Sequence, residues 1–118
     1  MQQRTIIVSL AAAALALAFG TASANGNIAA GKKKAAVCAA CHGADGNGIA
    51  SNYPALAGQY QDYLEQALHE YKDGERTNAI MNGMAAPLTK QDIENLAAYF
   101  SSLPSKLSDL HGKINGGH

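Results

Sequence analysis

Two cysteines and a histidine stand together in this 118-residue chain, in the run Cys38-Ala39-Ala40-Cys41-His42. Thiols three positions apart can each add to one vinyl group of a haem, and the histidine that follows can bind the iron axially. This spacing is the signature of covalent haem attachment. The sequence therefore predicts one haem c per chain, attached through Cys38 and Cys41, with His42 as the proximal iron ligand.

Other chemistries use the same pair of cysteines, and the rest of the sequence argues against them. A thioredoxin-like redox pair belongs to a βαβ arrangement, whereas the strand signal is weak throughout this chain. A zinc ribbon needs a second cysteine pair, and the whole sequence has two cysteines. Copper binding by Cys, His and Met residues is a weaker alternative, which a haem stain after denaturing electrophoresis would exclude if positive.

Residues 1–24 have the three parts of a secretory signal peptide. Arg4 supplies a positive charge, an apolar run follows over 6–19, and Ala22-Ser23-Ala24 is a small-x-small cleavage motif. We predict cleavage after Ala24 and export to the periplasm. The apolar run is shorter than the roughly 20 residues that span a bilayer, so no span is expected in the mature chain. An uncleaved segment that acts as an anchor stays open as the alternative.

The remaining sequence has a helical pattern, and we expect three main helices. The first covers about 28–37 and is capped by Asn27. The second covers about 59–71, and the third begins at a capping box on Thr89 and ends before Pro104. Apolar residues recur at helical spacing at Tyr60, Tyr63, Leu64, Ala67, Leu68 and Tyr71, and at Ile93, Leu96, Ala97, Phe100 and Leu103.

Segments 43–54 and 73–89 are rich in glycine and other turn-forming residues, and we expect both to be loops. The second of them contains Met81 and Met84, the two methionines that follow the signal peptide. A thioether is a soft, neutral ligand that favours ferrous iron. One of these methionines is therefore expected at the sixth coordination position, and spacing alone leaves open which one.

The haem motif, the three helices and the methionine-bearing loop together resemble the class I cytochromes c. The chain is most similar to the small monohaem cytochrome c-553 type of bacteria and to one half of a dihaem cytochrome c-4. The resemblance covers 25–103 and rests also on Gly31, on NYPALAGQ at 52–59 and on LTKQDI at 88–93. It implies an all-α class I cytochrome c fold around one covalent haem, followed by a C-terminal tail, 104–118, that we expect to be flexible.

The resemblance also implies roles for residues on both sides of the haem. Pro54 corresponds to the proline whose backbone carbonyl accepts the N–H of the proximal imidazole, here that of His42. Met81 aligns with the axial methionine of the family, and Met84 remains the alternative. His42 and Met81 would then be the two axial ligands.

Two further implications concern packing. Gly31 corresponds to the small residue that lets the first and last helices cross closely, near Leu96 and Tyr99 or Phe100. The sequence has one haem motif and no second copy of the helix pattern, so one haem per chain is expected. Whether two chains pair transiently, as the halves of a dihaem protein do, is left open.

These features predict a periplasmic electron-transfer protein that is not an enzyme. Its expected partners are redox proteins such as membrane-bound quinol-oxidising complexes, terminal oxidases or periplasmic reductases. Nine Lys and Arg residues balance nine Asp and Glu residues, which does not suggest nucleic acid as a partner. The alternative is a haem enzyme or gas-binding sensor with an open sixth coordination site, and a subunit of a larger oxidoreductase also stays open.

Overall fold

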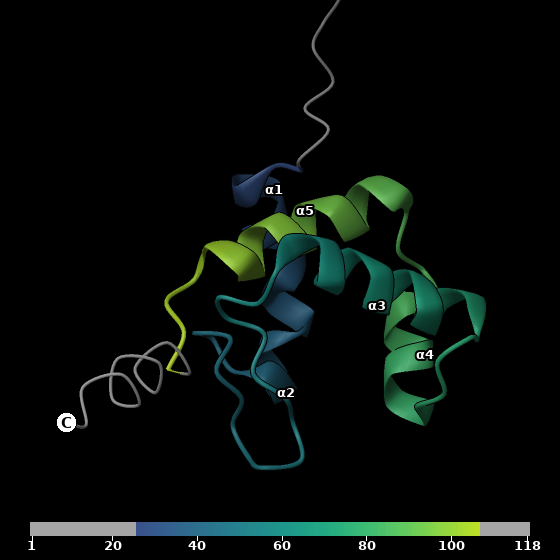
Figure 1. Ribbon diagram of the computed structural model, residues 1–118, viewed down its shortest axis with the longest axis horizontal. Helices are drawn as coiled ribbons and strands as arrows, with labels where there is room; N and C mark the ends of the chain where they lie inside the picture. The colour runs from purple at the N-terminus through teal and green to yellow at the C-terminus, as the bar shows by residue number, and fades with distance from the viewer. Residues whose placement is uncertain (1–25, 107–118) are drawn as a thin grey trace, which may run out of the picture.

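Helices and the loops between them make up residues 26–106, the part of the chain that this computed structural model describes (Figure 1). The predicted signal peptide, 1–24, lies outside the described residues, and so do residues 107–118 of the predicted tail. The elements are α1 (Ile28–Lys34), η1 (Ala35–Val37), α2 (Ala39–His42), α3 (Gln61–Asp73), α4 (Ala79–Ala85) and α5 (Lys90–Ser102). The predicted all-α class is confirmed for this part of the chain. No helix in it is long and apolar enough to cross a membrane.

Helices α1 and α5 cross in close contact, as predicted. Asn27 caps α1 by accepting the N–H of Ala30 at 2.9 Å, and its own N–H donates to the Asn95 side chain at 2.7 Å. At Gly31, a Cβ atom would overlap the backbone carbonyl of Asn95 and lie 2.7 Å from the Cβ of Tyr99. The predicted role of Gly31 is confirmed, and the crossing lies at Asn95 and Tyr99.

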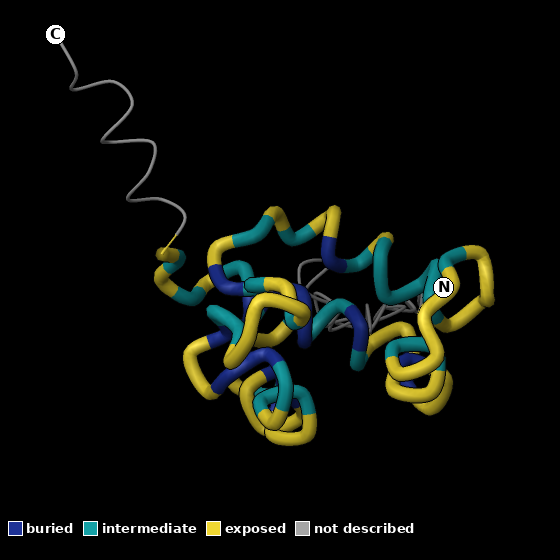
Figure 2. The backbone as a smooth tube through the Cα atoms, turned by 90° about the horizontal axis from the view of Figure 1, so that it is seen from below, coloured by how far each residue is buried: buried dark blue, intermediate teal, exposed yellow. Residues whose placement is uncertain are grey.

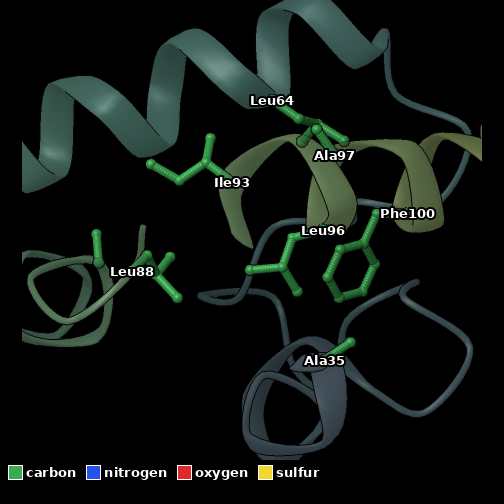
Figure 3. Packing of buried hydrophobic residues seen from close by; sticks show 8 residues of the cluster. Ala35, Leu64, Leu88, Ile93, Leu96, Ala97 and Phe100 are labelled. Atoms are coloured by element: carbon green, nitrogen blue, oxygen red, sulfur yellow. The ribbon is translucent and has the colours of Figure 1, made fainter. Parts of the chain in front are cut away.

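The hydrophobic core forms around α5, with α3 on one side and the α1–η1 segment on the other (Figure 3). Figure 2 shows the buried residues on the inner sides of the helices and exposed residues along their outer sides. Leu103, predicted as the last residue of the apolar stripe of α5, is the C-terminal cap of the helix and packs half-buried against the core. The buried cluster consists of Ala35, Leu64, Ala85, Leu88, Ile93, Leu96, Ala97 and Phe100.

Helix α3 differs from the prediction at its N-terminal end. It begins at Gln61 and not at residue 59, so Tyr60 precedes the helix and is 78% exposed, while Tyr63 is 47% exposed. The apolar stripe predicted there is therefore wrong for these two tyrosines, and Leu64 is the buried residue of the helix. Gly74, with a φ of 81°, ends the helix in the left-handed conformation that glycine adopts without strain.

The prediction of a loop over 73–89 is wrong, because this segment contains helix α4. Asn78 caps α4 by accepting the N–H groups of Ile80 and Met81, at 3.1 and 3.0 Å. Ala85, at the C-terminal end of the helix, is fully buried. Both candidate methionines therefore lie on a helix that is joined to α3 by a short turn (Figure 1).

Candidate functional site

One turn of helix brings the two cysteines and the histidine of the motif together. Cys38 caps α2, and its carbonyl accepts the N–H of Cys41 at 3.2 Å and that of His42 at 2.9 Å. Residues three and four positions apart lie on the same face of a helix. The thiols of Cys38 and Cys41 are half-buried and free, and His42 is 7% exposed.

The ring of His42 is oriented by a contact with the loop that follows. Its Nδ1 lies 2.8 Å from the backbone carbonyl oxygen of Pro54, the contact that the family resemblance implies. A carbonyl oxygen only accepts, so Nδ1 donates, which leaves Nε2 as the ring nitrogen that can bind a metal. A neutral imidazole held in this way is the form that binds a metal through Nε2.

Backbone hydrogen bonds hold the loop that carries Pro54. The carbonyl of Gly46 accepts the N–H groups of Leu56 and Ala57, at 2.7 and 2.9 Å. The N–H of Gly48 donates to the carbonyl of His42 at 2.7 Å. The residues that follow Pro54 are therefore hydrogen-bonded to the loop that begins at His42, and these bonds hold the Pro54 carbonyl near the His42 ring.

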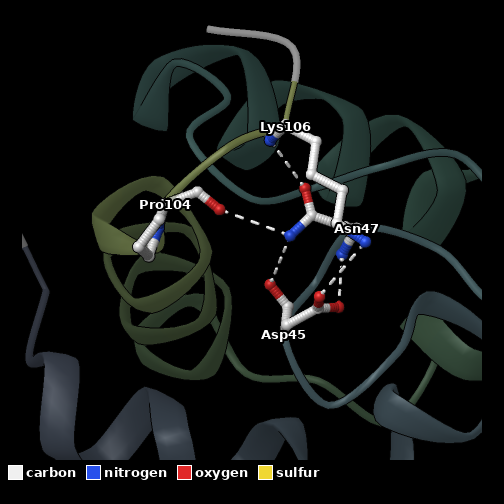
Figure 4. A network of polar contacts seen from close by, with 4 residues as sticks. All are labelled: Asp45, Asn47, Pro104 and Lys106. Carbon is white, nitrogen blue, oxygen red and sulfur yellow. Dashed lines mark hydrogen bonds and ion pairs between the residues drawn. The ribbon is translucent and has the colours of Figure 1, made fainter. Parts of the chain in front are cut away.

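Asn47 ties this loop to the chain that follows α5 (Figure 4). Its side-chain amide donates to the carbonyls of Asp45 and Pro104, at 3.2 and 3.3 Å, and its Oδ1 accepts the N–H of Lys106 at 3.0 Å. A hydrogen bond from the backbone N–H of Asn47 is the main reason that the pKa of Asp45 is below its ordinary value. The Lys106 ammonium lies 3.8 Å from the Asp45 carboxylate.

The sequence around Asn47 gives no signal for this role beyond a turn-forming residue type. Its partners Pro104 and Lys106 follow it by 57 and 59 positions, so no local pattern indicates the contact. Residues 104–106, predicted to begin a flexible tail, lie in this network.

The two candidate methionines of helix α4 differ in burial and in surroundings. Met81 is half-buried and lies one turn before the fully buried Ala85, on the face of α4 that turns to the core. Met84 is 37% exposed. It lines an open groove of about 450 Å³ together with Leu88 and with Val37, the residue before Cys38. The structure thus places Met84 in one groove with the residue before Cys38, and it does not place either sulfur on a metal.

The donor set fits a covalently attached haem better than it fits the alternatives. Burial raises the pKa of the Cys38 thiol, whereas a redox-active or catalytic cysteine needs a lowered pKa. Within residues 26–106, no group of three or more His, Cys, Asp or Glu side chains is arranged to hold a metal ion. Two half-buried thiols and an imidazole oriented through its Nδ1 are the groups that thioether attachment and axial ligation require.

Comparison with known proteins agrees with this chemistry. The family model for cytochrome c matches residues 28–104. Cytochrome c4 of Pseudomonas aeruginosa is 54% identical over 83 residues, which cover 70% of this chain and 41% of that protein. Cytochrome c-554(548) of Halomonas halodenitrificans is 48% identical over 80 residues, which cover 65% of this chain and 96% of that protein.

The fold has a similar counterpart among solved structures. The crystal structure of reduced recombinant cytochrome c4 from Pseudomonas stutzeri matches with a TM-score of 0.66 and 46% sequence identity. The match covers 69% of this chain and 47% of that chain. The chain thus spans about half the length of the cytochrome c4 proteins that it matches, and nearly the whole length of the shorter relative.

Proposed function

Because the chain belongs to the cytochrome c family, we propose that it carries single electrons between redox proteins of the periplasm. With one Cys-x-x-Cys-His motif, it binds one haem c covalently through Cys38 and Cys41. The bound group supplies an iron that alternates between the ferrous and ferric states. The observation that carries the proposal is the 2.8 Å contact between His42 Nδ1 and the Pro54 carbonyl oxygen.

This contact determines what His42 contributes. Because the Pro54 carbonyl accepts the Nδ1 proton, Nε2 is the ligating atom, and the hydrogen bond raises the basicity of the imidazole. A methionine on the opposite face favours the ferrous state. His42 and a methionine together would leave no position on the iron open to a substrate, so we propose a carrier and not an enzyme.

Met81 is our proposed distal ligand, with Met84 as the alternative. Met81 is the more buried of the two and shares a helix face with Ala85, which is fully buried. Met84 lies at the surface of the groove. A ligand that also covers one face of a haem is expected on the inward side of its helix.

The compartment and the partners are part of the same proposal. The signal-peptide pattern over 1–24 supports export to the periplasm, where the partners would be quinol-oxidising complexes, terminal oxidases or periplasmic reductases. Redox encounters of this kind use small interfaces, generally under about 1,200 Å². A subunit of a larger oxidoreductase would use the same chemistry with a fixed partner.

The test is the optical spectrum of the matured ferric protein at about 695 nm, where methionine-to-iron coordination gives a weak band. We expect Met81→Ala to lose the band and Met84→Ala, the matched control three positions away, to keep it. Loss of the band in Met84→Ala alone would assign the ligand to Met84. A wild-type protein that lacks the band, and that binds carbon monoxide readily when reduced, would instead indicate an enzyme or sensor with an open site.

A further inference from the structure

We propose that Asn82 is the positioning residue for Met81, because its side chain fixes helix α4 against the end of α3. The inference rests on the proposed His42 and Met81 ligation. It concerns a neighbouring residue whose amide makes no direct contact with the metal and acts through the helix that carries Met81.

The side chain of Asn82 joins three separate parts of the backbone. Its amide nitrogen donates to the carbonyl oxygens of Tyr71, in the last turn of α3, at 2.6 Å and of Arg76, in the turn, at 2.8 Å. Its Oδ1 accepts the N–H of Asn78, the cap of α4, at 2.7 Å. Both amide hydrogens and one oxygen lone pair are therefore used, which is nearly the full capacity of the group.

Helix α4 depends on such contacts because it has little else to hold it. It has seven residues, and an isolated helix of that length is unstable in water. Ala85 is its one buried residue, and a single buried Ala supplies little apolar area. Of the other elements, α3 is the one against which α4 packs most extensively. Besides the Asn82 bonds, the Lys72 ammonium of α3 donates to the carbonyl of Ala86, the C-terminal cap of α4, at 2.8 Å. The position of α4 is thus set mainly by polar bonds to the end of α3 and to the turn, and Asn82 supplies those at the Met81 end of the helix.

Two successive hydrogen bonds connect Asn82 to Met81. Asn78 donates its N–H to the Asn82 side chain and accepts the N–H of Met81 on its own side chain, at 3.0 Å. Loss of the Asn82 contacts would therefore release both the turn and the cap that fixes the first turn of α4. Arg76 also stacks on the ring of Tyr71, at 4.9 Å from its centroid, but this contact joins the turn to α3 and does not reach α4.

The test compares two Asn→Asp variants of the haem-loaded protein. In Asn82→Asp, a carboxylate oxygen replaces the amide nitrogen and faces the carbonyls of Tyr71 and Arg76, so two hydrogen bonds become repulsive contacts. The matched control is Asn95→Asp. The Asn95 oxygen accepts from Asn27 at 2.7 Å and from the Gln91 side chain at 3.0 Å, and a carboxylate can accept both bonds.

The readout is the affinity of the ferric protein for imidazole, which displaces methionine, followed by loss of the band at about 695 nm. We expect Asn82→Asp to bind imidazole at least about tenfold more tightly than wild type, which is about 1.4 kcal/mol. Far-UV circular dichroism should stay native without imidazole, since the core around α5 is untouched. Asn95→Asp should bind imidazole as wild type does.

Three results would overturn the inference. If a folded Asn82→Asp protein binds imidazole with the wild-type affinity, Asn82 does not position Met81, although Met81 can still be the ligand. If Asn82→Asp does not fold, Asn82→Ser, which keeps one hydroxyl donor, replaces it, and unchanged imidazole affinity in that variant would have the same meaning. Absence of the band in wild type would refute the ligation itself, and the inference with it, so the two failures are distinguished by the wild-type spectrum.

Discussion

The crossing of α1 and α5 makes Gly31→Ala the most direct test of the packing argument. Gly31 is buried inside α1, and an added methyl group would overlap the backbone carbonyl of Asn95. That carbonyl belongs to the middle of α5 and cannot rotate aside as a flexible side chain can. Relief of the overlap therefore requires the two helices to separate.

Two opposing terms determine the size of the effect. Alanine is favoured over glycine inside a helix by about 1 kcal/mol. Overpacking a well-filled contact costs about 1–3 kcal/mol, and a clash with backbone belongs at the upper end of that range. We therefore expect Gly31→Ala to lower the free energy of unfolding by about 2 kcal/mol. For a domain of this size, that lowers Tm by roughly 8–16 °C.

The assay is guanidinium unfolding of the haem-loaded protein, followed by far-UV circular dichroism. Ala29→Gly is the matched control, because Ala29 is an exposed residue of the same helix and reports the intrinsic helix term alone. That variant should lose about 0.5–1 kcal/mol. Equal or greater stability in Gly31→Ala would refute the reasoning, since it would mean that the intrinsic term outweighs the contact with α5.

Two further predictions concern the polar contacts that hold the ends of the fold. Asp92, in the capping box of α5, has a pKa below its ordinary value of 3.8, mainly because it accepts the N–H of Thr89, with a smaller contribution from Lys34. A carboxyl group with a lowered pKa stabilises the fold at pH values above its ordinary pKa. This stabilisation is lost as the pH falls through the pKa of the folded state. Urea unfolding from pH 7 to 2.5 should therefore show wild type losing more stability than Asp92→Asn, mostly below pH 3.8, and parallel curves would contradict this. Asn47→Ala should destabilise the haem-loaded protein by about 1–2 kcal/mol in the same assay, because the loop that follows His42 loses its hydrogen bond to the Pro104 carbonyl. An unchanged unfolding midpoint would mean that this hydrogen bond does not contribute to stability.

Sequence reasoning succeeded where the determining interactions are local. The cap of α1 at Asn27 and the capping box of α5 at Thr89 are set by residues within three positions of each other, and both occur as predicted. The apolar spacing of α5 located its buried face from Ile93 to Phe100. The helix ends at Ser102, before Pro104 as predicted, and Leu103 caps it while packing partly buried against the core.

Helix α4 was missed because its sequence is ambiguous at short range. Gly83 lies inside the helix and Pro87 just beyond it, and both residue types usually indicate a loop. Two signals in the sequence favoured a helix. Asn78 is a good cap, and Met81, Ala85 and Leu88 recur at helical spacing. The bonds from Asn82 that position the helix reach 11 residues back to Tyr71, and no periodic pattern predicts them.

The two candidate axial ligands are consequently supported in different ways. His42 is held by Pro54, whose loop is bonded to the His42 carbonyl, to itself and to the chain beyond α5. Met81 lies on a short helix that two side chains, Asn82 and Lys72, bond to the end of α3 and to the turn. Displacing the loop would break backbone bonds at several points, whereas displacing α4 requires the loss of a few side-chain bonds. Under mild denaturant or heat, we therefore expect the proposed Met81 bond to open before the His42 bond and before global unfolding, so the band at about 695 nm should disappear at a lower denaturant concentration than the helical signal. Coincident transitions would mean that α4 and the core unfold as one cooperative unit.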